Sequence, residues 1–205
     1  VGIMNSVNML DNMDAIATIV SIFIFCAAAM LIYISGTHNN IHFLILLGLI
    51  GALSGFLIFN WHPSKLYMGD TGSQFLGVFL AAFGVIFLWN SIDKHGEFVQ
   101  SKQFLVTILA FVIPIVDTST VVINRLASGR SPFIGGKDHT THNLFYHGIT
   151  EKRIAVLFTI ISLVSTFFIY LIIKVIDQWN YIHIILFNLY FLAVFTALFF
   201  ATKRN

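Results

Sequence analysis

Residues 15–35 read AIATIVSIFIFCAAAMLIYIS, an apolar run without a charged side chain. A helix needs roughly 20 predominantly apolar residues to cross a bilayer, and this run is long enough. It lacks the alternation of polar and apolar residues that a membrane β-barrel strand would show. Because lipid offers the backbone no hydrogen-bond partners, we expect the run to form a membrane-spanning helix.

Five further segments have the same character, at 43–61, 74–92, 104–123, 154–176 and 181–201. The 205-residue chain is 58% hydrophobic and 10% charged, whereas an ordinary soluble domain has about 25% charged residues. This composition excludes a disordered chain and an ordinary soluble enzyme, and the single cysteine excludes a disulfide scaffold. The predicted fold is an all-α, polytopic membrane helix bundle with six transmembrane helices, and we treat residues 1–205 as one integral-membrane domain.

Lysine and arginine are unevenly distributed between the two sides of this predicted bundle. The side with both termini carries Lys65, Arg125, Arg130, Lys137, Lys152, Arg153, Lys203 and Arg204, and the other side carries Lys94, Lys102 and Lys174. An excess of Lys and Arg marks the cytoplasmic side, so both termini and the loops 62–73 and 124–153 are expected there. The net charge of +2 and the lack of a basic aromatic patch argue against a nucleic-acid partner.

The first polar stretch places Asn5, Asn8, Asp11 and Asp14 at every third position before the first span. On a helix such residues form a polar strip, because positions three apart are neighbours. Carboxylate and amide oxygens suit a hard cation such as Mg²⁺. A solvated helix entry with an aspartate cap is the alternative.

A second stretch, residues 65–73, reads KLYMGDTGS and leads directly into an apolar helix. Asp70 lies between two glycines and can approach a ligand or metal closely, Lys65 can meet a phosphate, and Tyr67 can stack on a base. The alternative is an ordinary capped turn. The chain has no P-loop and no GxGxxG motif, so a standard NTPase or dinucleotide-binding domain is excluded.

The third stretch is the predicted loop 124–153, in which Arg130, Lys137, His139 and His142 suit an anionic, phosphate-bearing ligand. A zinc site started by the two histidines is an alternative, although no HExxH motif or thiolate accompanies them. A solvated basic loop is the other alternative.

Asp117 is an ionisable residue inside the predicted span 104–123. A carboxylate within the membrane suggests function by default, but this one lies near the cytoplasmic end. We therefore expect a structural role, with bonds to Thr118, Ser119 or Asn124 or a pair with Arg125. We expect His38, His42, His62, His95 and His183 to be interfacial or packing residues.

Taken together, these stretches resemble the polyprenyl-phosphate N-acetylhexosamine-1-phosphate transferases, a superfamily that includes the bacterial GlcNAc-1-phosphate transferases and the phospho-MurNAc-pentapeptide translocase. The matching segments are Asn5 to Ala15, Met68 to Ser73, Pro114 to Thr118, and Gly129 to Phe133 followed by His139 and His142. They occur in the family's order, all on one predicted membrane face.

The chain departs from the family pattern in three respects. Asn12 and Ala15 stand where the family usually has glycines, and the histidines are spaced differently, as His139-x-x-His142. The adjacent aspartate pair of an earlier family loop does not occur. Family members also have about four more spans before this region, so we expect the chain to be an N-terminally truncated fragment that is inactive alone.

The resemblance implies an enzyme of the bacterial cytoplasmic (inner) membrane. It would transfer an N-acetylhexosamine-1-phosphate, most closely GlcNAc-1-phosphate, from a UDP-sugar to undecaprenyl or another polyprenyl phosphate, release UMP, and initiate synthesis of a cell-envelope polysaccharide such as lipopolysaccharide O-antigen. Phospho-MurNAc-pentapeptide transfer in peptidoglycan synthesis is the alternative within the family.

The resemblance also implies site roles and a cofactor. Asn8 and Asp70 would be ligands of Mg²⁺, with Mn²⁺ as an alternative, and Asp70, His139 and His142 would be the catalytic residues. The residues implied to bind substrate are Asn5, Asp11, Asp14, Asn60, Lys65, Tyr67 and Arg130. Outside the family, the rivals are a membrane transporter and a structural membrane subunit. A second copy of the chain is a further candidate partner, since the sequence leaves the oligomeric state open.

Overall fold

The computed structural model describes residues 1–132 and 135–203, which form helices and no strand. Phe133 and Arg204, used above in the motif and the charge distribution, lie outside the described residues. The α-helices are α1 (Gly2–Leu10), α2 (Ile16–Ile34), α3 (Ile41–Asn60), α4 (Gly69–Phe83), α5 (Gln100–Ala110), α6 (Val112–Ala127), α7 (Thr140–Tyr146), α8 (Glu151–Tyr170) and α9 (Tyr181–Ala201). Two π-helical segments, η1 (Gly84–Trp89) and η2 (Leu171–Val175), continue α4 and α8.

The predicted polytopic membrane bundle is confirmed. Among the described residues, five helical segments are long and apolar enough to cross a membrane, and a sixth crossing exists if α5 and α6 are counted as one. These two helices are bent by 73° at their junction, so the segment 104–123, expected to form one span, is divided between two helices. Pro114 lies in the first turn of α6, where the missing N–H is tolerated. The same residue in a continuous helix would remove a hydrogen bond and clash with the preceding turn.

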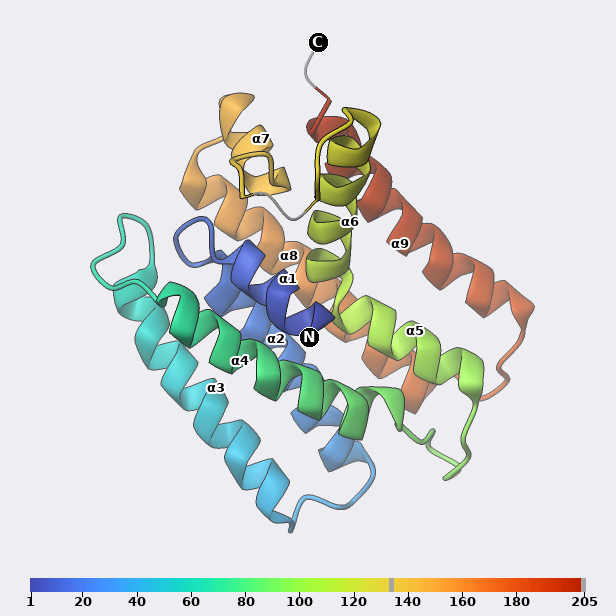
Figure 1. Cartoon of the computed structure of the whole chain (residues 1–205). Coiled ribbons are helices and arrows are strands. Elements are labelled where there is room, and N and C mark those ends of the chain that lie inside the picture. The colour runs from blue at the N-terminus through green and yellow to red at the C-terminus, as the bar shows by residue number, and fades with distance from the viewer. Residues whose placement is uncertain (133–134, 204–205) are drawn as a thin grey trace.

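Helix α2 is the centre of the bundle, and α3, α4 and α8 pack around it (Figure 1). Its buried residues include Ala27 and Ala28, whose small side chains let neighbouring helices approach. In contrast, few residues of α3 and α9 are buried, and their apolar side chains are mostly exposed or partly exposed. Exposed apolar surface of this extent is typical of a face that contacts the membrane or another protein segment.

Helix α1 is short, and the chain turns before α2 begins. The polar strip expected as one helix from Asn5 to Asp14 therefore ends at Leu10, and residues 11–15 form a turn. Ala15 closes this turn with φ +67°, a left-handed conformation that is unfavourable for a residue with a Cβ. The turn directs Asp11 and Asp14 toward the α3–α4 connection instead of along the surface of a helix.

The connections that carry the sequence motifs gather at one end of the bundle. The α1–α2 turn, the α3–α4 loop, α7 and the end of α9 lie toward the top of the view in Figure 1. At the opposite end Lys102 donates to Asp93 (Nζ–Oδ2, 3.0 Å), and both side chains are buried. Burial raises the pKa of Asp93, but hydrogen bonds from the Glu97 backbone and from Lys102 outweigh this effect, so that the net result is a lowered pKa.

Candidate functional site

A cavity of about 240 Å³ opens between the α1–α2 turn, the end of α3 and the start of α4. Its lining consists of Asp11, Asn12, Met13, Asp14, Asn60, Tyr67, Gly69 and Asp70. We call it the carboxylate pocket, because three of these residues are aspartates and none of them is Lys, Arg or His. A phosphate-bearing ligand could enter such a pocket only together with a cation.

Asn8 and Asp70, the residues expected to bind metal, lie side by side. Asn8 Nδ2 donates to Asp70 Oδ1 at 3.2 Å and to Ser73 Oγ at 2.8 Å. Gly69, at φ +68°, makes the turn that brings Asp70 to the start of α4. Helix α1 can lie this close to α4 because Gly77 faces the backbone of Met4: a Cβ on Gly77 would lie 2.7 Å from Met4 Cα.

Asp11 completes the acidic side of the pocket. Burial, followed by the charge of Asp70, raises its pKa to about 6, while a hydrogen bond from the Gly69 backbone opposes the shift. Asp11 and Asp70 therefore repel each other when both are charged. Oxygen donors with excess negative charge are the ligand set of a hard divalent cation, so the residues present fit Mg²⁺, which Asp70 and Asn8 would hold with Asp11 nearby.

Asn60 is buried and joins three elements. Its Oδ1 accepts from the Ala15 backbone N–H (3.2 Å) and from Thr18 Oγ1 (2.8 Å), and its Nδ2 donates to the Leu66 carbonyl (2.9 Å). The amide thus fixes the start of α2 relative to the α3–α4 loop. This gives Asn60 a positioning role in the pocket wall, in addition to the substrate contact that the resemblance implies.

Of the remaining residues expected to bind substrate here, two line the pocket and two lie outside its lining. Tyr67 lines the pocket and is 72% exposed, so its ring is accessible for stacking. Asp14 lines the pocket too, and its Oδ2 accepts from the Ser64 backbone at 3.0 Å. Lys65 and Asn5 are exposed and lie outside the residues that line the pocket.

Asp117 holds the histidine segment in place. The side chain is 1% exposed, and its Oδ2 lies 2.8 Å from His139 Nδ1. Its Oδ1 accepts from the Thr140 backbone (2.9 Å) and from Thr140 Oγ1 (2.6 Å). The expectation of partners within α6 was therefore wrong, because the carboxylate points into the start of α7.

Arg125, a partner considered for Asp117, instead forms a bidentate pair with Asp138, at 2.8 Å (Nε–Oδ2) and 2.6 Å (Nη2–Oδ1). It also donates to the Pro132 carbonyl at 2.8 Å. The hydrogen bond from Arg125 and its charge lower the pKa of Asp138, against the effect of burial. Arg125 thus holds Pro132 and Asp138, which come before and after residues 133–134 in the sequence.

His142 lies on α7, and the preceding residue, Thr141, connects this helix to the carboxylate pocket. Thr141 Oγ1 donates to Asn12 Oδ1 at 2.6 Å, and Asn12 is one of the pocket-lining residues. Burial, followed by the electrostatic effects of His139 and Lys137, lowers the pKa of His142, which favours the neutral form of its ring. Its Nδ1 is buried and makes no hydrogen bond to the described residues.

Arg130 is not brought into the carboxylate pocket. It lines a second cavity of about 490 Å³, near α6, α7 and the end of α9, with Lys137 and Lys203 among the other lining residues. The zinc alternative for His139 and His142 gains no support, because the one metal-compatible group found among residues 1–132 and 135–203 is formed by other side chains.

Sequence reasoning missed two contributors to this end of the bundle. His62, expected to be an interfacial or packing residue, lies 2.9 Å from Asp14 and 3.0 Å from Glu151 (Nδ1 to carboxylate oxygens). Glu151 had not been singled out, because an acidic residue in the first turn of a helix is common. The sequence offered a clue only for His62, because it lies two residues after Asn60, which was already assigned to substrate binding.

Comparison with known proteins gives a consistent result. The model of glycosyl transferase family 4 matches residues 1–88. A probable undecaprenyl-phosphate N-acetylglucosaminyl 1-phosphate transferase of Bacillus subtilis is 30% identical over 152 residues, which cover 74% of this chain and 40% of the relative. A phospho-N-acetylmuramoyl-pentapeptide-transferase of Wolinella succinogenes is 30% identical over 186 residues, covering 83% of this chain and 49% of the relative. A decaprenyl-phosphate N-acetylglucosaminephosphotransferase of Mycobacterium leprae is 28% identical over 169 residues, covering 77% and 42%.

The chain thus spans roughly two fifths to one half of the length of these curated relatives. The family match covers the residues that build the carboxylate pocket, from α1 to the end of α4. The relatives extend the similarity through most of the remaining helices. This multi-pass membrane chain belongs to the superfamily of polyprenyl-phosphate N-acetylhexosamine-1-phosphate transferases.

Proposed function

We propose that this protein transfers a sugar-1-phosphate from a UDP-N-acetylhexosamine to a polyprenyl phosphate. An oxygen of the lipid phosphate attacks the phosphorus nearest the sugar, the pyrophosphate bond breaks, and UMP leaves. The observation that carries the proposal is the contact of Asn8 with Asp70, which together with Asp11 lines a pocket that has no cationic side chain among its described lining residues. A divalent cation bound there would offset the repulsion between the phosphates of donor and acceptor.

The chain's own residues position the substrates. Tyr67 offers an exposed ring at the pocket for the uracil base. His139, held through Nδ1 by Asp117, keeps Nε2 for a ligand. His142, on the helix α7 that follows, can donate or accept a hydrogen bond in its neutral form, which the lowered pKa favours. Arg130 and Lys137, in the neighbouring cavity, place positive charge for a phosphate group.

A membrane location follows from the substrates. The polyprenyl chain stays in the bilayer while its phosphate meets a water-soluble nucleotide sugar at the surface. We propose that the end of the bundle with the pocket faces the cytoplasm of a bacterial inner membrane, since the described Lys and Arg residues concentrate there. External labelling of a cysteine placed at Gly136 would contradict this orientation.

GlcNAc-1-phosphate is the transferred group that we favour, supported by the Bacillus subtilis and Mycobacterium leprae relatives, whose names specify it. MurNAc-pentapeptide-1-phosphate is the second candidate, because the relative with that name covers more of this chain. The two differ in donor size, so competition between UDP-GlcNAc and UDP-MurNAc-pentapeptide distinguishes them.

The proposal is tested by UMP release from UDP-GlcNAc with polyprenyl phosphate and Mg²⁺. The assay uses membranes containing the protein as its gene encodes it, so that any residues before Val1 are included. Binding of UDP-GlcNAc to the 205-residue chain in detergent provides a second, independent measurement. We expect Asp70→Asn to abolish UMP release and Mg²⁺-dependent binding. Full activity of Asp70→Asn would refute the assignment of this pocket.

A further inference from the structure

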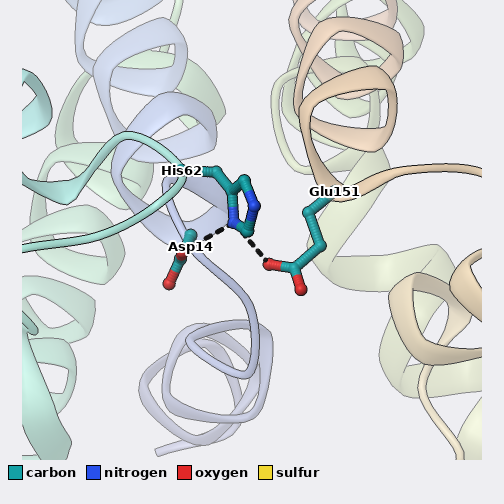
Figure 2. Close-up of side chains that lie close together, drawn as sticks. All are labelled: Asp14, His62 and Glu151. Atoms are coloured by element: carbon teal, nitrogen blue, oxygen red, sulfur yellow. Dashed lines mark hydrogen bonds and ion pairs between the residues drawn. The ribbon is translucent and has the colours of Figure 1, made fainter.

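Three side chains from three separate elements meet at the edge of the carboxylate pocket (Figure 2). Asp14 comes from the α1–α2 turn, His62 from the α3–α4 loop, and Glu151 is the first residue of α8. His62 Nδ1 lies 2.9 Å from Asp14 Oδ2 and 3.0 Å from Glu151 Oε2. All three potential ligand atoms lie within 4.8 Å of one another.

The spacing of these atoms suits a metal ion. At metal–ligand bonds of about 2.0–2.2 Å, two ligand atoms about 3 Å apart subtend close to 90° at the metal. A nitrogen and two carboxylate oxygens can therefore occupy neighbouring positions around one ion without moving far. A single proton on His62 Nδ1, in contrast, cannot point well at both oxygens, because a hydrogen bond weakens steeply as it bends.

The ligand chemistry points to a class of ion. One imidazole nitrogen with two carboxylate oxygens suits first-row transition metals such as Zn²⁺ and Mn²⁺, whereas Mg²⁺ prefers oxygen ligands alone. The side chains are partly exposed, at 33% for His62, 17% for Asp14 and 26% for Glu151. An ion could thus enter from solvent and keep water as its remaining ligands.

A supporting contact already orients one of the carboxylates. The Ser64 backbone N–H donates to the same Asp14 oxygen that faces His62, at 3.0 Å. Such outer contacts fix the direction of a ligand and are typical of metal sites in proteins. The cluster is also set apart from the Asn8–Asp70 pair, since it uses the α3–α4 loop and α8 where that pair uses α1 and α4.

We propose that Asp14, His62 and Glu151 bind a divalent transition-metal ion, distinct from the Mg²⁺ assigned to Asn8 and Asp70. The ion ties the α1–α2 turn, the α3–α4 loop and the start of α8 together along one wall of the carboxylate pocket. This proposal does not rest on the transferase activity, because the site is defined by its own ligands.

The test uses Co²⁺ as a spectroscopic probe on the purified, metal-stripped chain, with millimolar Mg²⁺ present to saturate the Asn8–Asp70 pair. We expect one equivalent of Co²⁺ to bind with visible absorption bands, Zn²⁺ to displace it, and Zn²⁺ to raise the midpoint of thermal unfolding. Loss of one ligand, in His62→Gln or Glu151→Gln, should weaken binding by about ten-fold or more, the loss seen when even an outer contact of a metal site is removed.

Two controls locate the site. His38→Gln, which changes an exposed histidine in the α2–α3 connection, should bind Co²⁺ like the wild type. Asp70→Asn should also keep the Co²⁺ bands, which separates this site from the one assigned to Mg²⁺. Failure of the wild-type chain to bind Co²⁺ or Zn²⁺ would overturn the proposal without relying on any variant, and so would unchanged affinity in folded His62→Gln. UMP release enters none of these readouts, so failure of the transferase assignment would leave them intact.

Discussion

Replacing Gly77 by alanine should disturb the candidate site from a distance. A Cβ at Gly77 would lie 2.7 Å from Met4 Cα and 3.2 Å from the Met4 carbonyl oxygen. Carbon atoms in contact prefer about 3.5–4.0 Å, and the obstructing atoms are backbone, which cannot rotate away. Helix α1 must therefore move from α4 by about 1 Å.

That movement acts directly on the residues assigned to metal binding. Asn8 lies one helical turn after Met4 on α1, and Asp70 lies in the first turn of α4, about two turns before Gly77. The bond from Asn8 Nδ2 to Asp70 Oδ1 is already 3.2 Å long, so a shift of about 1 Å takes it beyond hydrogen-bond range. Overpacking of this kind costs about 1–3 kcal/mol, partly offset by about 0.5–1 kcal/mol because alanine suits a helix better than glycine.

The assays are Mg²⁺ binding by calorimetry, UMP release and thermal unfolding, with Gly51→Ala as the matched control. Gly51 is also a helical glycine, and a Cβ there meets no atom within 4 Å, so the control should keep both binding and activity. A displacement of about 1 Å can lower turnover by about 10²-fold, and we expect a loss of that order for Gly77→Ala. Wild-type Mg²⁺ affinity and UMP release in folded Gly77→Ala would refute the reasoning.

Three other variants test neighbouring features of the site. Ala15→Gly should raise the thermal unfolding midpoint, because it relieves a left-handed strain of about 1–2 kcal/mol; a lower midpoint would contradict this. Asp117→Asn should weaken charge-assisted bonds to the His139 segment worth about 1.5–3 kcal/mol and reduce UMP release while Mg²⁺ binding is kept; unaltered release would show that the contact does not position the ring. The pKa of Asp138 is lowered by Arg125, so this pair adds stability above the unfolded carboxyl pKa of about 3.9, and that stability disappears as the pH falls through the folded value. Between pH 7 and pH 3 the midpoint of Asp138→Asn should consequently fall less than that of the wild type, and equal falls would argue against the pair.

The apolar runs predicted the membrane-spanning helices because their signal is local. Each run of about 20 residues must become a helix in lipid whatever its neighbours are, and the observed bounds differ from the predicted ones mainly at the ends. The bend between α5 and α6 was not predicted. Pro114 indicates where a helix is weak, but only the packing of α6 against α1 and α9 selects the direction of the bend.

The proximity of Asn8 to Asp70 was expected from the resemblance, whereas the contacts of the histidine segment were not. Asn8 and Asp70 were assigned to one metal through the resemblance, and the structure brings them within 3.2 Å. The contact between Asp117 and His139 joins positions 22 residues apart, and Thr141 reaches Asn12 across 129 residues. Neither contact has a local signal, since each depends on how α6 and α7 pack onto the rest of the bundle.

Helix α1 packs between α4, which carries Asp70, and α6, which carries Asp117, and so connects the two parts of the proposed site. On one side it approaches α4 through Gly77 and presents Asn8 to Asp70. On the other side Ser6 Oγ donates to the Pro114 carbonyl at 2.9 Å and lies 2.7 Å from Thr118 Oγ1, which directly follows Asp117 on α6. The bend before Pro114 directs α6 across α1, and the Asp117 carboxylate from there holds the start of α7. The pair proposed to bind metal and the histidine segment are therefore positioned relative to each other by one short helix and one buried carboxylate, which accounts for the burial of Ser6 and Asp117 in an otherwise apolar bundle.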